Sequence, residues 1–292
     1  MNVLIHNPTA SRGDARKREG DAVAALRAAG IEFDILHTKR PGHATQLARH
    51  AVERGARLVI AAGGDGTVHE VAQGMWDTDA VLGVIPMGTG NDFAEAHGIP
   101  RNLKKAVEII RDGQDCRSDV GHFGEWSFFN TVGIGFDAVV SIKSRAIERL
   151  RGDLLYLVAV LKTFRSYRST DMEVLAPGFQ RSGPTYMLTV CIGQREGGGF
   201  TLAPDAIIDD GLFDVCLVDN IRIPTVLRMI PKAMKGTHTG MSFVEMLKVP
   251  DVTVTSPEPI VLHADGQIYR TERTTLEFRC EREALNVRMH PV

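Results

Sequence analysis

Two short glycine-rich segments carry the residues best suited to chemistry in this 292-residue chain. The first is Gly63-Gly64-Asp65-Gly66-Thr67, and the second runs from Pro86 to Asp92. Glycines leave backbone N–H groups open to a phosphate, and a helix that starts directly after them adds positive potential. Because the carboxylate of Asp65 would repel bare phosphate, it indicates a divalent cation or a substrate hydroxyl between the two.

A purely structural explanation fits the first segment equally well, namely a tight turn from strand to helix with Asp65 as a helix cap. The second segment favours the chemical interpretation, because it again combines glycines with a carboxylate after an apolar run. No Gly-Lys dipeptide occurs in the sequence, which excludes a Walker A loop. Residues 133–138 match a GxGxxA pattern, but no βαβ unit follows, so we do not interpret them as a dinucleotide site.

The first third of the chain predicts alternating strands and helices that would position these segments. Apolar runs indicate strands at 3–5, 33–36, 58–62 and 81–86, and the composition or apolar spacing indicates helices at 14–29 and 44–52. Such alternation implies right-handed crossovers and a parallel sheet. Loops after successive parallel strands lie at the carboxyl edge of the sheet, where open α/β sheets bind ligands.

From about residue 120 the pattern changes to short β-rich runs. A strand is expected at 126–134 and a helix at 137–167, and further strands at 184–192, 212–218, 251–255, 259–263, 274–279 and 285–289, interrupted by a helix at 224–236. This pattern favours an antiparallel β-sandwich. We therefore expect an α/β plus all-β protein, with an α/β nucleotide-binding domain of mostly parallel sheet at 1–125 and a β-sandwich domain with helical insertions at 126–292.

The ordered set of motifs resembles the diacylglycerol kinase catalytic domain family, which includes sphingosine kinases and bacterial soluble lipid kinases. A GGDG sequence alone is weak, since NAD kinases and phosphofructokinases share it. The resemblance extends over nearly the whole chain and rests on Asn7-Pro8, residues 42–44, 63–67, 88–94, 133–138, 197–199 with 204–206, 210–215 and 264–266. It implies an ATP-binding α/β domain and a β-sandwich domain, with the active site in the cleft between them.

The resemblance also implies which residues bind cofactors. The nucleotide would contact Asn7, Thr38, Gly63, Gly64, Asp65, Gly66, Thr67, Glu70, Gly88, Thr89 and Asn91. A Mg²⁺ ion in the second domain would be held by the Asp210 carboxylate and by the backbone carbonyls of Ile207 and Leu212, which are the hard oxygen ligands that this cation prefers. From the sequence alone, an Asp-Gly turn between two strands explains residues 210–211 as well.

The expected catalytic residues depart from the family pattern at one position. By resemblance, Asp65 and Asp92 would hold the catalytic metal or orient the γ-phosphate. The family places its general base in an Asp-Gly-Glu sequence, whereas this chain has Asp265-Gly266-Gln267. An amide does not accept a proton at neutral pH, and loss of a general base costs about 10²–10⁴-fold in rate. Either Asp265 serves as the base, or the activity is weak, or the chain only binds nucleotide.

The net charge and the basic segments of the chain indicate which binding partners to expect. The net charge of −2 argues against nucleic acid as a partner, and without a long apolar stretch or a signal peptide we expect a cytoplasmic protein. A lipid substrate would require peripheral contact with the inner membrane surface, and basic residues near an apolar stretch are suited to it: Lys143, Arg145, Arg149, Arg151, Lys162, Arg165, Arg168, Arg228, Lys232 and Lys235. The alternative is a solvated basic face over a buried core, and a homodimer is left open.

Three functional hypotheses follow from these observations. The first is an ATP- and Mg²⁺-dependent kinase acting on diacylglycerol or a related lipid alcohol. The second is an NAD kinase, which shares the GGDG sequence but fits residues 88–92 and the later motifs less well. The third is a catalytically impaired nucleotide-binding module, for which Gln267 is the only support.

Overall fold

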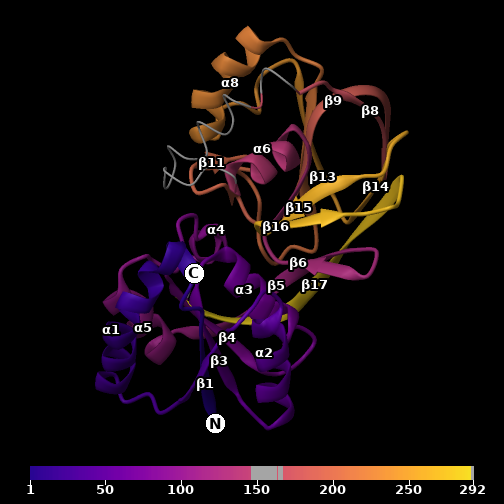
Figure 1. The fold of residues 1–292 in the computed structure, drawn as a ribbon. Helices are drawn as coiled ribbons and strands as arrows, with labels where there is room; N and C mark the ends of the chain where they lie inside the picture. Colours follow the sequence, from indigo (N-terminus) through magenta and orange to yellow (C-terminus); the bar gives the residue numbers. More distant parts are fainter. Residues whose placement is uncertain (146–162, 164–166, 291–292) are drawn as a thin grey trace. The chain divides into compact units, whose positions relative to one another are not determined.

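The computed structural model describes residues 1–145, 163 and 167–290 and divides the chain into two compact units (Figure 1). Unit 1 comprises Met1–Val120 and Arg282–Val292, and unit 2 comprises Gly121–Glu281. The chain passes from one unit to the other within strands β5 (Gln114–Phe123) and β17 (Thr275–Met289). Our expected boundary at 125/126 did not include this return of the last residues to unit 1.

Unit 1 is built on a parallel sheet. Strand β1 (Asn2–His6) lies between β2 (Asp34–His37) and β3 (Leu58–Gly63), and β4 (Val81–Pro86) and the end of β17 continue the sheet beyond β3. Every one of these pairings is parallel. The run of buried residues in β3 and β4 is what a strand covered on both faces requires.

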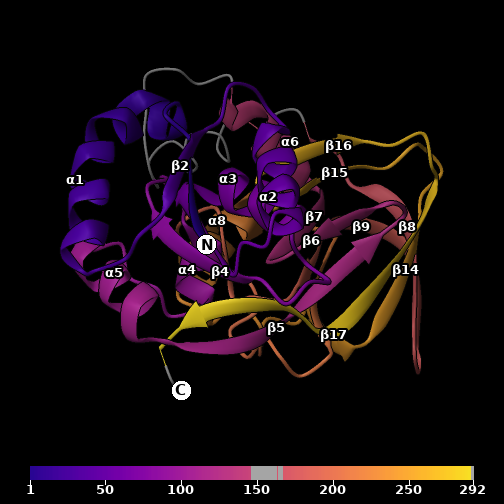
Figure 2. The same cartoon turned by 90° about the horizontal axis from the view of Figure 1, so that it is seen from below.

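Helices cover both faces of this sheet, as Figure 2 shows. Helices α1 (Asp14–Ala28) and α5 (Leu103–Asp112) pack on one face, where Leu26 and Ile110 join Leu4 and Ile60 in one core cluster. Helices α2 (His43–Glu53) and α3 (Asp65–Gln73) contact each other on the opposite face. This arrangement confirms the expected α/β fold of the N-terminal part.

The order of the strands predicts where a ligand would bind. The chain moves from β1 to β2 on one side and then returns to β3 on the other side of β1. The loops after β1 and β3 therefore run in opposite directions away from the sheet edge, and open α/β sheets bind ligands at such a point. The Asn7 loop and the Gly63–Thr67 loop are those two loops.

The strand pairs of unit 2 are antiparallel. Strand β9 (Phe179–Cys191) is long enough to pair with three other strands. Its first half pairs with β8 (Thr170–Ala176), and its second half pairs with β7 (Thr131–Gly135) and β12 (Phe213–Asp219). Besides the adjoining parts of β5 and β17, the described residues of this unit form β6 (Trp126–Phe128), α6 (Phe136–Arg145), β10 (Arg195–Glu196), β11 (Phe200–Thr201), α8 (Ile223–Met234), β13 (Val244–Val249), β14 (Asp251–Thr255), β15 (Val261–Ala264) and β16 (Gln267–Arg270).

The alternation of side chains along β12 separates two cores. Val215 and Leu217 belong to a cluster that contains several phenylalanines, among them Phe128. Cys216 and Val218 point into a second cluster, to which α6 and α8 contribute. Successive strand residues face opposite sides of a sheet, so β12 covers both cores. The sheet and its two covered faces agree with the expected β-rich second half.

Several predicted elements differ from the structure. The strands expected at 274–279 and 285–289 form the single strand β17, because residues 280–284 contain neither Gly nor Pro to end it. The strand expected at 126–134 is divided into β6 and β7. The predicted helix 137–167 is present as α6 up to Arg145, and the remainder lies largely outside the described residues.

Helix α5 and strand β5 were not predicted. The Asn102 side chain caps α5 by accepting a hydrogen bond from the backbone N–H of Lys105 at 3.1 Å. The buried residues Ala106, Val107, Ile109 and Ile110 have the three- and four-residue spacing of a helix face. The sequence therefore contained the signal for this helix.

Candidate active site

The loop after β3 turns into a helix through a single residue, Gly64. A Cβ atom on Gly63 would lie 2.4 Å from Oγ1 of Thr67, so a side chain at this position is incompatible with the observed turn. Thr67 is buried, and its Oγ1 accepts a hydrogen bond from Nδ2 of Asn7 at 2.9 Å. This bond connects the loops after β1 and β3, between which a ligand is expected.

The loop after β4 lies directly against the loop after β3. A Cβ atom on Gly88 would be 2.4 Å from Cα of Gly64, and a Cβ atom on Gly64 would be 2.9 Å from Cα of Gly88. Carbon atoms that are not bonded to each other pack at about 3.5–4.0 Å. Glycine is thus required at both positions for the two backbones to make this contact.

The Asp65 carboxylate joins the same two loops. Its Oδ2 accepts the N–H of Asn91 at 2.7 Å, and its Oδ1 accepts the N–H of Phe93 at 3.1 Å. These donors are at the N-terminus of the short helix α4 (Asp92–Ala96), where a negative charge is favourable. Asp65 therefore positions the second loop, and its predicted contact with a metal or phosphate stays a prediction.

Asn91 closes the second loop. It adopts a left-handed conformation with φ = 57°, and its side chain bonds both backbone groups of Gly88: Oδ1 accepts the N–H at 2.8 Å and Nδ2 donates to the carbonyl at 2.9 Å. Thr89 is exposed on the loop, whereas Asp92 is buried in the first turn of α4. The loop is therefore held by its own side chains and by Asp65.

Glu70 organises the third loop of this edge, the one after β2. Its Oε1 accepts the N–H of Gly42 at 2.8 Å and its Oε2 accepts that of Ala44 at 3.1 Å, so the carboxylate caps helix α2. In the same loop, the N–H of Thr38 donates to the carbonyl of His6 at 3.0 Å. Glu70 thus acts here as a positioning residue for the loop that carries Thr38.

All eleven residues that the resemblance assigned to nucleotide binding gather at the carboxyl ends of four neighbouring parallel strands. Asn7 follows β1, Thr38 follows β2, Gly63 to Glu70 end β3 and begin α3, and Gly88 to Asn91 follow β4. Exposed backbone N–H groups and a helix N-terminus at such an edge can hold a phosphate chain. Their contact with a nucleotide stays a prediction.

The predicted catalytic residues of unit 2 lie at the hairpin between β15 and β16. The Asp265 carboxylate accepts three backbone N–H groups: from Phe129 at 2.7 Å, and from Asn130 and Thr131 at 2.9 Å each. Asp265 itself has φ = 47°. Its oxygens hold the turn against the start of β7, and its predicted role as the general base stays a prediction. Gln267 begins β16 and pairs with Ala264 across the turn.

The predicted Mg²⁺ ligands include a carboxylate that already has a cationic partner. Oδ2 of Asp210 is 2.7 Å from Nζ of Lys248, and its Oδ1 accepts the N–H of Leu212 at 3.0 Å. Lys248 also lies 3.9 Å from Asp214, whose pKa is raised by burial. The oxygen donors suit Mg²⁺, but a cation bound through Asp210 would have to displace Lys248. The ligand set of Ile207, Asp210 and Leu212 therefore does not fit as it stands.

A buried triad that we did not predict lies beside these elements of unit 2. Nε2 of His263 is 3.0 Å from Oδ2 of Asp137 and 2.6 Å from Oε1 of Glu196. Burial and the Asp137 charge raise the pKa of Glu196 to about 8. Burial would lower the pKa of His263, but the two carboxyl groups outweigh it and raise that pKa. Both raised pKa values favour protons held inside this buried triad.

The sequence held a partial signal for this triad. Asp137 lies in the 133–138 segment and His263 directly precedes the Ala264-Asp265-Gly266 motif, and both segments carry the family resemblance. Gly133 is required beside them, because a Cβ atom there would be 2.1 Å from Oδ2 of Asp137. Glu196 comes from a separate hairpin strand, β10, and only the fold brings it to the other two.

Comparison with known proteins agrees with this geometry. Residues 2–123 match the model of the diacylglycerol kinase catalytic domain, and residues 130–289 match the model of the YegS C-terminal NAD kinase beta sandwich-like domain. A diacylglycerol kinase from Bacillus subtilis is 32% identical over 269 residues, which are 90% of this chain and 88% of that protein. The chain belongs to the diacylglycerol kinase family. It is accordingly a kinase.

Other members extend the similarity to the whole chain. A protein from Chromohalobacter salexigens named "Probable lipid kinase YegS-like" is 33% identical over 253 residues, 85% of this chain and 81% of that protein. The crystal structure of a diacylglycerol kinase from Bacillus anthracis superimposes with a TM-score of 0.81 at 26% identity, covering 99% of this chain and 97% of the other. The family, its two-part fold and its kinase class therefore agree with the sequence motifs.

Proposed function

We propose that this kinase transfers the γ-phosphate of ATP to a hydroxyl of diacylglycerol or a related lipid. One observation supports the donor side above all: two glycine loops, in contact at Gly64 and Gly88, are fixed by the Asp65 bonds to the amides of Asn91 and Phe93. Phosphoryl transfer asks a protein mainly for positioning and charge stabilisation. Rigid loops rich in backbone N–H groups meet the first requirement.

The donor phosphates would lie along the carboxyl edge of the unit 1 sheet. The N-terminus of α3 begins at Asp65, and Asn7 and Thr67 are joined beside it. Backbone N–H groups there would bind phosphate oxygens, and Thr38 and Thr89 would flank the nucleotide from the neighbouring loops. ATP would enter as its Mg²⁺ complex, in which the cation neutralises the phosphate oxygens. No step is assigned to a cation at Asp210, because Lys248 neutralises that carboxylate.

The acceptor hydroxyl would lose its proton without a strong protein base. Asp265 is committed to three backbone N–H bonds, and Gln267 has no basic oxygen at neutral pH. The loose transition state of phosphoryl transfer develops little charge on the attacking oxygen, so it needs less help from a base than acyl transfer does. We therefore expect a slow but genuine lipid kinase.

Contact with the lipid surface would be made by helix α8. Val226, Met229 and Ala233 are buried in the core of unit 2. The opposite face exposes Leu227 and Met234 with Arg228, Lys232 and Lys235, and no acidic residue occurs from 223 to 235. Exposed apolar residues among cations favour an anionic bilayer surface. Among the described residues, none of the helices is long and apolar enough to cross a membrane.

The test is a kinase assay with ATP and Mg²⁺ and a panel of acceptors: diacylglycerol in anionic vesicles, phosphatidylglycerol, a sphingoid base and NAD. We expect phosphate transfer to a lipid alcohol and none to NAD. Phosphorylation of NAD would replace the lipid assignment. If ATP binds but no acceptor is phosphorylated, the protein is a nucleotide-binding module, a second candidate that the committed carboxylate of Asp265 and the amide of Gln267 favour.

A further inference from the structure

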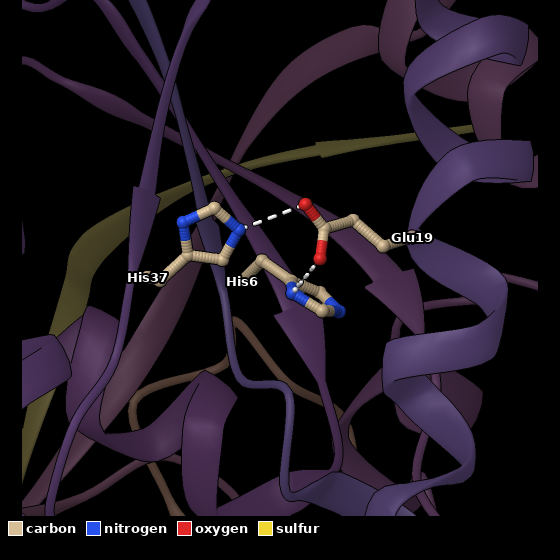
Figure 3. A group of neighbouring side chains, drawn as sticks. All are labelled: His6, Glu19 and His37. Atoms are coloured by element: carbon tan, nitrogen blue, oxygen red, sulfur yellow. Dashed lines mark hydrogen bonds and ion pairs between the residues drawn. The ribbon is translucent and has the colours of Figure 1, made fainter.

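Three side chains of unit 1 outside the glycine loops converge on one point, as Figure 3 shows. They are His6 at the end of β1, His37 at the end of β2, and Glu19 on α1. Oε2 of Glu19 is 3.2 Å from Nδ1 of His6, and Oε1 is 2.8 Å from Nε2 of His37. The donor atoms of all three residues lie within 4.8 Å of one another.

The parallel pairing of β1 with β2 accounts for this convergence. His6 and His37 are directly paired in the register of the two strands, and their rings are 5.7 Å apart between centroids, at 88° to each other. Glu19 is in the second turn of α1, the helix that follows the loop after β1. The arrangement is therefore set by the backbone of the sheet and helix, and no mobile loop is needed to form it.

One ring nitrogen of the buried His6 lacks a hydrogen-bond partner. The residue is 1% exposed, and its Nε2 is 3.2 Å from the carbonyl oxygen of Ala15, which can only accept a hydrogen bond. Nε2 therefore carries the proton, and in the neutral ring Nδ1 presents a lone pair. Nδ1 lies 3.2 Å from Oε2 of Glu19, yet it has no hydrogen-bond partner. An unpartnered ring nitrogen in a buried side chain is unfavourable, and a cation held by both Nδ1 and the nearby carboxylate oxygen would relieve it.

We propose that His6, Glu19 and His37 bind a Zn²⁺ ion. Two imidazole nitrogens and one carboxylate, with a water in the fourth position, form a common ligand set for this metal. Tetrahedral bonds of about 2.0–2.1 Å place ligand atoms roughly 3.3 Å apart, close to the observed 2.8 and 3.2 Å. The His6 contact with Ala15 is the second bond that a metal-binding histidine normally makes to a carbonyl.

The site is open to solvent on one side. The side chains of Glu19 and His37 are 29% and 44% exposed, so an ion has access and the ring of His37 can keep its proton on Nδ1. Mg²⁺ prefers oxygen ligands and is a poor fit to two imidazoles. Bound zinc would fasten the ends of β1 and β2 to α1 directly before Asn7 and Thr38.

The test is metal binding by the full-length chain after removal of metals with a chelator, without nucleotide. Isothermal titration with Zn²⁺ should give one ion per chain, and Co²⁺ should give the visible absorption of a four- or five-coordinate site. His37→Ala should weaken Zn²⁺ binding at least about tenfold, since even outer partners of a metal site contribute 10–100-fold. Glu19→Gln should do the same, and excess Mg²⁺ should not compete.

His50→Ala is the matched control. His50 is an exposed histidine of α2 that lies 3.9 Å from Glu53, so it is a histidine–carboxylate pair with no described third ligand close to it. We expect this variant to keep wild-type Zn²⁺ affinity, and Zn²⁺ to raise the melting temperature of wild type and His50→Ala but not of His37→Ala. Absent zinc binding, equal losses in both histidine variants, or competition by Mg²⁺ would each overturn the proposal and leave a plain His–Glu ion pair.

Discussion

The contact between the two glycine loops of the candidate site, at Gly88 and Gly64, predicts a large effect of Gly88→Ala. The new Cβ atom would lie 2.4 Å from Cα of Gly64, whereas about 3.5–4.0 Å is an ordinary separation. The obstacle is backbone and cannot rotate away, so the two loops must separate by roughly 1 Å. Gly88 does not have a left-handed φ, so the strain would come from contacts and not from the backbone conformation.

This displacement should cost activity more than stability. Overpacking of this size costs about 1–3 kcal/mol of unfolding free energy, which lowers the melting temperature by roughly 2–12 °C for a protein of this size class. A 1 Å misplacement of binding groups reduces the rate about 10²-fold. We therefore expect Gly88→Ala to fold, to bind ATP more weakly, and to lower kcat/KM for ATP by about 10²-fold.

The assay combines steady-state kinetics with ATP titration calorimetry and thermal melts. Gly20→Ala is the matched control, because Gly20 lies in helix α1 and a Cβ atom added there would meet nothing within 4 Å. An alanine there should stabilise the helix by about 0.5–1 kcal/mol and leave kcat/KM unchanged. If Gly88→Ala keeps kcat/KM within threefold of wild type, the contact with Gly64 does not position the phosphate-binding loops and the reasoning fails.

Three further changes test the ionic groups of unit 2. Lys248→Gln should make the melting temperature rise with Mg²⁺, because Asp210 loses its ammonium partner; an unchanged response would contradict this. The raised pKa of Glu196, about 8, means that the folded state holds a proton that the unfolded chain releases near 4.5. Urea unfolding should therefore show stability falling, by up to about 1.4 kcal/mol per pH unit, as pH rises from 5 to 8. Glu196→Gln should flatten that slope, and a slope as steep as that of wild type would refute the assignment. Gln267→Glu should raise kcat if a missing base limits turnover, and an unchanged kcat would show that it does not.

The parts of the fold that follow local periodicity were predictable from the sequence. The parallel strands of unit 1 have continuous apolar runs, and glycines mark where β3 ends. Such patterns depend on neighbours in sequence and need no knowledge of distant contacts. The return of β17 to unit 1 was not predictable in this way, because only the pairing of Asn286 and Val287 with β4 reveals it.

The loops that carry the candidate residues were predictable from the sequence, whereas the hydrogen bonds that their carboxylates make were not. The sequence motifs indicate which loops carry Asp65, Glu70 and Asp265. They do not indicate which groups form hydrogen bonds with the carboxylate oxygens of these residues. In the structure each of these carboxylates accepts backbone N–H groups and holds a neighbouring loop or helix end. A charged acceptor that holds two or three N–H donors stabilises a loop strongly. The sequence therefore predicted catalytic or ligand-binding roles for carboxylates that, in the structure, also hold loops in place.

The two histidine-containing clusters could not be predicted from the sequence either. His6 and His37 are distant in sequence and become neighbours only through strand register, and His263 meets Glu196 only through the packing of unit 2. No motif spacing brings them together, so a search for metal or catalytic patterns along the chain passes over both. Their environments nevertheless differ in a way that decides their chemistry. His263 is buried between two carboxyl groups that raise its pKa, whereas burial lowers the pKa of His6, whose Nδ1 has no hydrogen-bond partner 3.2 Å from Glu19. The fully buried cluster around His263 therefore favours protons, whereas the cluster around His6, with Glu19 and His37 part-exposed, is accessible to a metal ion.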